Sequence, residues 1–264
     1  VLPAKEVAAY FPLIVAACSD YLSGIPFIIE LEVFKTWKES LFEWAAISYS
    51  GAAGLQQLME ITARDEFGLI VVNSPELQEL NTAISEYRQI QRDIAAKRQE
   101  LYKEVESGSG DITADTLIIL NKLRAELSAL VDKREPAYQR LKNAREAYAA
   151  KIQSMTVEER KNFDQRFVPE IAIPVGVKYM AKNIMECIKF FGGSVEMNVW
   201  RGVAAYNSGL QRTKDTNGLP FVRETVQYTR DVLSNLTKSL ELKYAYSTND
   251  ADLIAKTKER INVR

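Results

Sequence analysis

The chain has 264 residues, 47% of them hydrophobic, which is enough for one large domain or two smaller ones with a substantial core. Its formal net charge is −1 at pH 7, so overall charge gives no reason to expect binding to nucleic acid or to an anionic membrane. It contains no histidine, which excludes Ser-His-Asp and Cys-His catalytic sites and the usual His-containing zinc sites, and leaves carboxylates, Tyr, Lys and Cys for acid–base chemistry.

The first predicted element is a helix over residues 4–23, because apolar residues from Val7 to Cys18 recur on one face. Residues 14–18 loosely resemble a lipoprotein processing site, but they lack a basic start and a long apolar core, so they are interpreted as part of this helix. No apolar run approaches the ~20 residues of a membrane span. Cys18 and Cys187 either pair in an exported protein or remain as buried free thiols.

A second helix is predicted to open at Pro26 and to run to Ser40. Glu39, near its end, has apolar neighbours on both sides: Phe34, Trp37, Leu41, Phe42 and Trp44. Burial among apolar groups disfavours an ionised carboxylate and raises its pKa, and such a glutamate becomes a proton donor near neutral pH. A surface glutamate on an aromatic-rich helix is the alternative that this pattern leaves open.

A loop over residues 47–54 and a third helix at about 54–64 follow, and from Pro75 the pattern changes to a 3-4 spacing of apolar residues. Two such runs, separated by a polar turn at 107–111, predict an antiparallel helical hairpin of the coiled-coil type over residues 75–161. Pro136 is expected to kink or restart the return arm. The seam positions are Leu77, Leu80, Ile84, Tyr87, Ile94, Leu101 and Val105, then Leu120, Leu123, Leu127, Leu130, Arg134, Ala137, Leu141, Ala144 and Tyr148.

Beyond the hairpin, helices are predicted at about 174–191, 195–206 and 221–240, with a polar loop over 210–219. Gly192-Gly193 is expected to end the first of them. The last stretch is predicted to be a loop and one short helix. Because strand signals are weak throughout, the fold is predicted to be mainly α: a globular helical domain made of residues 1–74 and 162–264, with the hairpin 75–161 inserted between its halves.

Four short motifs occur in order along the chain. The first is Glu39-Ser40 followed by Ser48-x-x-Gly51-Ala52-x-Gly54-Leu55-x-Gln57-Leu58-Met59. The other three are Pro169-x-Ile171-x-x-x-x-Gly176-x-x-Tyr179-Met180, Ala204-Ala205-Tyr206-Asn207-Ser208-Gly209 and Pro220-Phe221-Val222-Arg223-Glu224-Thr225-x-x-Tyr228. The set resembles the catalytic domain of soluble lytic transglycosylases, the goose-lysozyme-like enzymes that cleave peptidoglycan. The resemblance covers roughly residues 5–66 and 167–235, omits the hairpin, and implies a lysozyme-like helical fold.

The resemblance implies that a single glutamate, here Glu39, performs both proton transfers, with no cofactor and no metal. Glu39 would protonate the glycosidic oxygen between N-acetylmuramic acid and N-acetylglucosamine, while the acetamide of the substrate stabilises C1. The ionised Glu39 would then take the proton from the C6 hydroxyl, which closes on C1 to give a 1,6-anhydro sugar. This scheme differs from that of glycosidases with two carboxylates.

Further roles are implied by position in the four motifs. Ser48 and Ser50 would hold the acetamide, and Gln57, Tyr206 and Asn207 would line the sugar subsites and orient Glu39. The supporting residues would be Ser40, Gly54, Glu224 and Tyr228, the last two bracing the floor of the cleft. Each has an ordinary alternative, since serines are common in turns, tyrosines in half-buried cores, and glycines where the backbone requires them.

The chain departs from the family pattern at three positions: Gln56 stands where Met is usual, Glu60 where Pro is usual, and Phe221 where Tyr is usual. Glu60 either alters substrate preference, or allows some hydrolysis, or lies at the surface. The largest departure is the hairpin, which occupies an interval that is normally short.

The leading interpretation is an active bacterial lytic transglycosylase of the periplasm or cell envelope, exported by a signal that this chain does not contain. Its partners would be peptidoglycan glycan strands and, through the hairpin, a protein partner or a second copy. The alternatives are a hydrolytic muramidase on the same fold and a non-catalytic cell-wall-binding scaffold that acts through the hairpin. A cytosolic coiled-coil adaptor conflicts with the four motifs.

Overall fold

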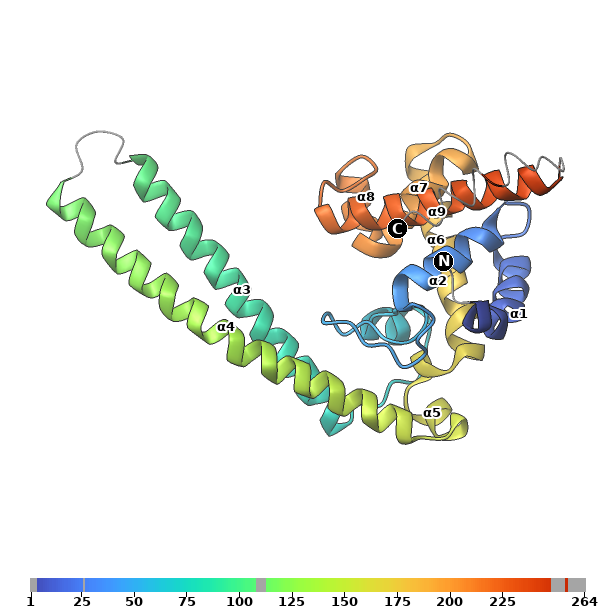
Figure 1. Ribbon diagram of the computed structural model, residues 1–264, viewed down its shortest axis with the longest axis horizontal. Coiled ribbons are helices and arrows are strands. Elements are labelled where there is room, and N and C mark those ends of the chain that lie inside the picture. The colour runs from blue at the N-terminus through green and yellow to red at the C-terminus, as the bar shows by residue number, and fades with distance from the viewer. Residues whose placement is uncertain (1–3, 26, 108–112, 248–254, 256–264) are drawn as a thin grey trace. The chain divides into compact units, whose positions relative to one another are not determined.

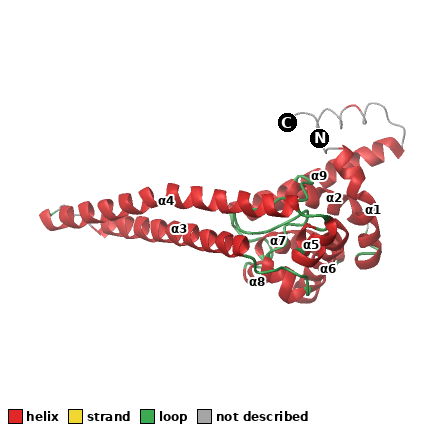
Figure 2. Ribbon diagram, turned by 90° about the horizontal axis from the view of Figure 1, so that it is seen from below, coloured by secondary structure: helices red, strands yellow, loops and turns green. Residues whose placement is uncertain are grey.

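The computed structural model describes four parts of the chain: residues 4–25, 27–107, 113–247 and 255. Their regular structure is helical (Figures 1 and 2). Within these parts no strand is assigned, and extended pairing is confined to two isolated bridges, Ala53 with Leu58 and Val71 with Asp164. The mainly α fold predicted from the sequence is therefore confirmed. None of the described helices combines the length and the apolar character needed to cross a lipid bilayer.

Contacts between residues divide the chain into two units, which are described one at a time. Unit 1 comprises Val1–Ala46, Ala53–Val71 and Arg160–Arg264. Unit 2 comprises Ile47–Ala52 and Val72–Glu159. The short segment 47–52 thus groups with the long helices of unit 2 rather than with the residues that flank it in the sequence.

Unit 1 contains α1 (Ala4–Tyr21), α2 (Ile28–Ser40), α6 (Pro169–Phe191), α7 (Val195–Ser208), α8 (Leu210–Asp215) and α9 (Arg223–Ser247), with a π-helical turn at Thr62–Glu66 and a 3-10 turn at Gln165–Phe167. The short helix α5 (Val157–Phe163) contains the boundary between the units. Within unit 1, α6 packs against α1 and α7, and α2 packs against α1 and α9 (Figure 1). This arrangement brings the end of α2 against a helix that lies nearly 200 residues later in the sequence.

Helix α6 supplies the centre of this core because its apolar residues recur every three or four positions. Four of them are fully buried: Ile173, Val177, Met180 and Ile184. Helix α7 approaches α6 closely at Gly202, where a Cβ atom would lie 2.4 Å from Ile184 Cγ1. The predicted stop is confirmed, since Gly192 (φ 68°) caps the helix, but the helix begins at Pro169 rather than near residue 174.

The helix predicted at about 54–64 is wrong in its first half. The backbone of Ala53 and that of Leu58 exchange two hydrogen bonds of 3.1 Å, which close a turn. Gln57, inside the turn, has a positive φ of 46°, which a right-handed helix cannot contain. Helical structure begins only after this turn and includes the π-helical turn Thr62–Glu66.

Two further boundaries differ from the predictions. Helix α2 begins at Ile28, after Phe27 in the left-handed region (φ 58°), and Pro26, which was expected to open it, lies outside the described residues. The first half of the predicted polar loop 210–219 forms α8, whose Thr213 is fully buried although the segment carries no apolar stripe. Apart from residue 255, the predicted final loop and short helix lie outside the described residues.

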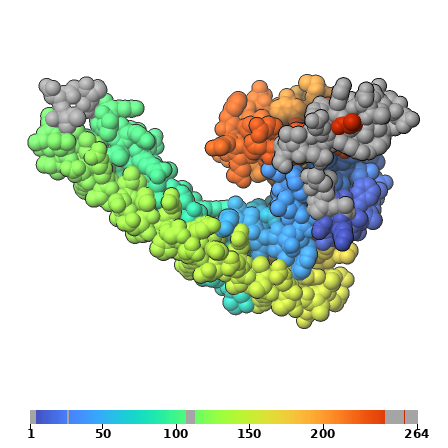
Figure 3. Space-filling model, in the orientation of Figure 1, coloured from blue at the N-terminus to red at the C-terminus, as the bar shows by residue number. Residues whose placement is uncertain are grey.

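Unit 2 is built on two long helices, α3 (Pro75–Ser107) and α4 (Ala114–Ser154), which lie side by side and run in opposite directions (Figures 1 and 2). Their side chains meet along the hairpin in the space-filling view (Figure 3). Helix α4 continues through Pro136, so the return arm does not restart there. The predicted polar turn at 107–111, except for Ser107, lies outside the described residues.

Apolar burial in the hairpin is concentrated toward the ends of α3 and α4 that lie away from the connecting turn. The buried seam residues are Leu77, Leu80, Ile84, Ile94, Leu120, Ala137, Leu141, Ala144 and Tyr148. Nearer the turn the prediction fails for Val105, which is 53% exposed although its spacing placed it in the seam. Polar links supplement the seam, since Arg140 on α4 forms ion pairs with Glu79 and Glu86 on α3.

Candidate active site

Glu39 lies one residue before the end of α2. The two residues that follow the helix, Leu41 and Phe42, both adopt left-handed backbone conformations (φ 54° and 63°), which end the helix and turn the chain sharply. The side chain of Glu39 is half-buried. The glutamate singled out from the sequence is therefore held at a rigid helix end with limited access to solvent.

Glu39 shares one face of α2 with three other polar residues. Glu32, Lys35 and Thr36 precede it by seven, four and three positions, and this spacing brings all four onto the same side of the helix. The other three are fully buried. The polar face of α2 is thus turned toward the interior of unit 1.

The carboxylate of Glu39 is held from across the core by α9. Tyr228 is buried and donates its hydroxyl hydrogen to Glu39 Oε1 at 2.5 Å. The same pair of helices is joined by an ion pair between Lys38 Nζ and Asp231 Oδ2 at 2.7 Å. Gln227 donates to the other oxygen of Asp231 at 2.6 Å, so the acceptor side of that pair is fixed as well.

Burial raises the pKa of Glu39 to about 7. The hydrogen bond from Tyr228 and the charge of Lys35 lower this pKa, whereas the charge of Glu32 raises it. Burial, together with the negative charge of Glu39, raises the pKa of Tyr228 well above its ordinary value, so this tyrosine remains a proton donor in the hydrogen bond. A carboxyl group that titrates near pH 7 can release a proton and take one up in the same catalytic cycle.

Tyr206 on α7 is also buried and lies at the same polar face. Its hydroxyl donates to the backbone carbonyl of Gln56 at 2.7 Å, and its ring lies 5.1 Å from the ring of Tyr179. The ammonium group of Lys35 lies 4.2 Å from the centroid of the Tyr206 ring. Asn207 follows on α7 and is partly exposed. Tyr206 therefore connects α7 to the turn at residues 53–58.

A buried ion pair between Arg166 and Asp164 lies next to the turn at residues 53–58. Arg166 donates to Asp164 through Nε (3.0 Å) and Nη2 (2.7 Å), and both side chains are almost fully buried. The backbone of Arg166 lies so close to Gly54 that a Cβ atom there would be 1.9 Å from Arg166 O. Gln57 donates from Nε2 to the carbonyls of Ala46 (3.2 Å) and Gly54 (2.9 Å). Gly54 and Gln57 thus shape this turn.

Ser48 and Ser50 belong to unit 2, and their loop packs on the hairpin. Ser48 Oγ accepts hydrogen bonds from the backbone N–H groups of Ser50 (3.2 Å) and Ala52 (3.0 Å), which is the ordinary role of a turn serine. Between them, Tyr49 stacks on Tyr138 with centroids 5.5 Å apart and a hydroxyl contact of 2.9 Å. Arg145 covers the Tyr49 ring at 4.1 Å. No local sequence pattern indicates this attachment.

The remaining predicted residues have simpler environments. Ser40 is buried and donates to the Thr36 carbonyl within α2 at 3.1 Å. Glu224 is exposed in the first turn of α9, whereas Tyr228 on the same helix is buried, and the bracing of a cleft floor by these two residues stays a prediction. Phe221 is 93% exposed. Glu60 pairs with Arg64 one helical turn later at 2.8 Å, in keeping with a surface position.

Glu32 and Lys35, which accompany Glu39 on the buried face of α2, were not among the site residues predicted from the sequence. A signal was available, because their distances of seven and four positions from Glu39 are those of one helix face. The apolar residues Ile29, Val33 and Trp37 form a stripe that does not include Glu32 and Lys35, and charged residues off such a stripe are normally solvated.

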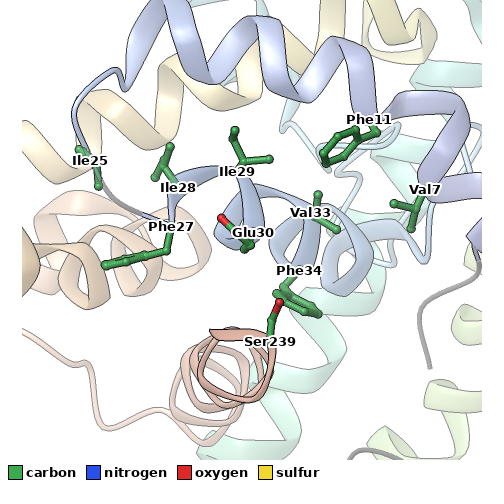
Figure 4. Close-up of a pocket in the computed structure, with 10 residues that line it drawn as sticks. All are labelled: Val7, Phe11, Ile25, Phe27, Ile28, Ile29, Glu30, Val33, Phe34 and Ser239. Carbon is green, nitrogen blue, oxygen red and sulfur yellow. The ribbon is translucent and has the colours of Figure 1, made fainter. Parts of the chain in front are cut away.

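The first half of α2 borders an apolar hollow of about 460 Å³ between α1, α2 and α9 (Figure 4). In Figure 4 Phe34 points toward Ser239 of α9, and Phe11 and Val7 close the side formed by α1. Glu30 is the one charged residue in the lining. A polar glycan is therefore not expected to bind there, and the hollow is separate from the Glu39 face.

The two cysteines are free thiols. Cys18 and Cys187 are both buried, and burial raises the pKa of Cys18 to about 12. Neither thiol is therefore a candidate nucleophile. Among the residues that the structure describes, no three Cys, Asp or Glu side chains gather closely enough to form a metal site.

In a comparison with known families, residues 139–228 match the model described as the transglycosylase SLT domain. The matched segment starts inside α4 and extends through α6, α7 and α8 into the first turns of α9. It contains Tyr206, Asn207 and Tyr228, whereas Glu39 lies outside it. No curated protein and no solved structure matches the chain.

Proposed function

We propose that this chain, which carries a transglycosylase SLT domain, is a peptidoglycan lytic transglycosylase with Glu39 as its acid and base. The family match supports a peptidoglycan-cleaving enzyme of lysozyme-like helical fold. The assignment of Glu39 rests on one observation: its half-buried carboxyl group has a pKa of about 7 and accepts a hydrogen bond from Tyr228. Tyr228 lies at the end of the matched segment and thus connects Glu39 to it.

In the first step, protonated Glu39 donates its proton to the glycosidic oxygen between N-acetylmuramic acid and N-acetylglucosamine. With a pKa near 7, a large fraction of Glu39 is protonated at neutral pH, whereas an ordinary glutamate would be almost fully ionised. The acetamide of the substrate stabilises the positive charge that develops at C1.

In the second step, ionised Glu39 takes the proton from the C6 hydroxyl as this oxygen bonds to C1, which gives the 1,6-anhydro product. The Tyr228 hydrogen bond favours the ionised carboxylate and so stabilises the state that acts as base. Glu32 is the other carboxylate whose charge acts on Glu39, and it is fully buried against Lys35. It cannot contact a sugar, which favours the one-carboxylate mechanism over the two-carboxylate one.

Substrate contacts are proposed for the residues that the resemblance implies. Ser48 and Ser50 hold the acetamide, Gln57 shapes the turn at residues 53–58, and Tyr206 and Asn207 line the sugar subsites. The partly exposed side chain of Asn207 is available for a polar contact with a glycan. The hairpin is an insertion between two halves of the catalytic domain, and the protein acts in the periplasm or cell envelope, where peptidoglycan is found.

The test is the mass of the products released from purified peptidoglycan. A lytic transglycosylase gives muropeptides that are lighter by one water than those from a hydrolase, because C6 oxygen replaces water at C1. We expect anhydro-muropeptides from the wild type and none from Glu39→Gln. Reducing-end products would indicate a hydrolytic muramidase on the same fold, and equal release by both proteins would show that Glu39 is not catalytic.

A further inference from the structure

The polar face of α2 contains an ion pair that solvent does not reach. Lys35 Nζ lies 2.7 Å from Glu32 Oε2, and both side chains are 0% exposed. Removing two charges from water is unfavourable, and apolar residues of the same size commonly stabilise a core as well or better. A buried pair beside the proposed acid–base residue therefore calls for an explanation other than stability.

The pair is part of a larger group of buried polar side chains, named here the buried cluster: Glu32, Lys35, Thr36, Gln56 and Tyr206. Lys35 donates to the Gly176 carbonyl at 3.4 Å and places its ammonium group 4.2 Å from the Tyr206 ring centroid. Gln56 donates to Thr36 Oγ1 at 2.9 Å and accepts from Tyr206 through its backbone carbonyl at 2.7 Å. Lys35 is thus the point at which α2, α6 and α7 meet.

The buried cluster adjoins Glu39 along the helix. Lys35 precedes Glu39 by one turn and Glu32 by two, all on one face. The positive charge of Lys35 favours the ionised form of Glu39, and the negative charge of Glu32 opposes it. The other charged or titratable groups that act on this carboxyl are Lys38 on α2, Tyr228 on α9 and Tyr206 on α7, and Lys38 is itself paired with Asp231 on α9.

We propose that the buried Glu32–Lys35 pair is a positioning unit of the active site, which holds the ring of Tyr206 and sets the electrostatic field at the carboxyl of Glu39. The proposal rests on the proposed function, in which Glu39 is the acid and base. Neither member of the pair contacts substrate, because both are fully buried. They act through Glu39 and Tyr206.

The two charges have opposite effects on Glu39, so their removal can be told apart from a loss of packing. Glu32→Gln keeps the size of the side chain and leaves the Lys35 charge unopposed. At a separation of two helical turns, ~10 Å, we expect the pKa of Glu39 to fall by roughly one pH unit. In Glu32→Gln/Lys35→Met both charges are absent, and because Lys35 has the larger effect we expect the pKa of Glu39 to rise above that of the wild type.

A matched control is available at the surface of unit 1. Lys182 and Glu66 form an ion pair at 2.5 Å with side chains 49% and 37% exposed, and neither charge is among those that act on Glu39. Glu66→Gln/Lys182→Met makes the same chemical changes, and we expect it to leave the titration of Glu39 unchanged.

The measurement is the NMR titration of the side-chain carboxyl carbon of Glu39, assigned by its loss in Glu39→Gln, on variants whose fold is checked by circular dichroism. We expect the alkaline limb of kcat/KM on peptidoglycan to move in the same direction as the NMR midpoint in each variant. Folded variants with the wild-type midpoint would overturn the proposal, since the pair would then be structural only. If the double variant does not fold, the NMR midpoint of Glu39 in Glu32→Gln is the test of the proposal.

Failure of this inference is distinguishable from failure of the proposed function. The NMR midpoint requires no turnover, so it reports on the field at Glu39 even if the chain cleaves nothing. The proposed function fails when wild type and Glu39→Gln release the same products, whatever the midpoint.

Discussion

Because the carboxyl group of Glu39 is half-buried, we expect Glu39→Gln to stabilise the protein. The gain should appear only at pH values at which this carboxyl is ionised in the unfolded chain. Burial raises the pKa of Glu39 from 4.5 to about 7 in the folded state. Between these values the folded protein binds more protons than the unfolded chain, so the wild type loses stability as the pH rises through this range. Glutamine has no such titration, and its side-chain carbonyl can still accept the hydrogen bond from Tyr228.

The size of the effect follows from the shift. A rise from 4.5 to about 7, at about 1.4 kcal/mol per pH unit, corresponds to roughly 3 kcal/mol of lost stability once Glu39 is ionised. We therefore expect Glu39→Gln to match the wild type near pH 4 and to exceed it by roughly 3 kcal/mol near pH 8. Stability and activity would change in opposite directions, since the variant also loses the carboxyl group proposed as acid and base.

The assay is urea unfolding followed by circular dichroism at several pH values between about 4 and 8. Glu224→Gln is the control because it makes the same change at an exposed position on α9, where we expect stability within about 0.5 kcal/mol of the wild type. A stability difference between Glu39→Gln and wild type that stays constant with pH would refute the reasoning, because it would show that Glu39 titrates alike in both states.

Three further predictions concern the supports of the site. Tyr228→Phe removes the hydrogen bond that lowers the pKa of Glu39, so we expect the pH–activity profile to move to higher pH by about one to two units; an unmoved profile would contradict the role of Tyr228. Arg166→Met removes the guanidinium that pairs with buried Asp164 and should lower the free energy of unfolding by about 3–5 kcal/mol, whereas Arg166→Met/Asp164→Asn should recover part of this loss in the same urea titration. Gly54→Ala should lower it by about 2 kcal/mol or more, because φ is +75° and the new Cβ would meet Arg166 O; a wild-type urea midpoint would exclude this contact.

The sequence predicts elements well where local periodicity and burial agree. Helix α6 is an example, since Ile173, Val177 and Met180 recur at core spacing and Gly192 ends the helix. The turn at residues 53–58 could not be predicted in this way, because it depends on Arg166, more than 100 residues later, and on the backbone pairing of its own ends. Long-range contacts of this kind leave no local pattern.

In the candidate site, too, individual residues could be predicted from the sequence but their long-range contacts could not. Glu39 could be singled out from its apolar neighbours, and Tyr228 from its motif, but the sequence did not reveal that one donates a hydrogen bond to the other. The attachment of Tyr49 to Tyr138 was also hidden, because it joins two segments that look unrelated in the sequence. Only the packing of distant helices decides these contacts.

Helix α2 shows why charge patterning alone is a poor guide to exposure. The apolar residues Ile29 and Trp37 are partly exposed, whereas the charged residues Glu32 and Lys35 are completely buried, as is apolar Leu31. The usual amphipathic rule assigns the apolar face to the core because burying unpaired charges is costly. Here opposite charges on one face cancel at close range, and the aromatic ring of Tyr206 covers the ammonium group, so the polar face can be buried. That burial is also what raises the pKa of Glu39, so the buried charges of α2 and the acid–base chemistry proposed for its last turn have the same physical origin.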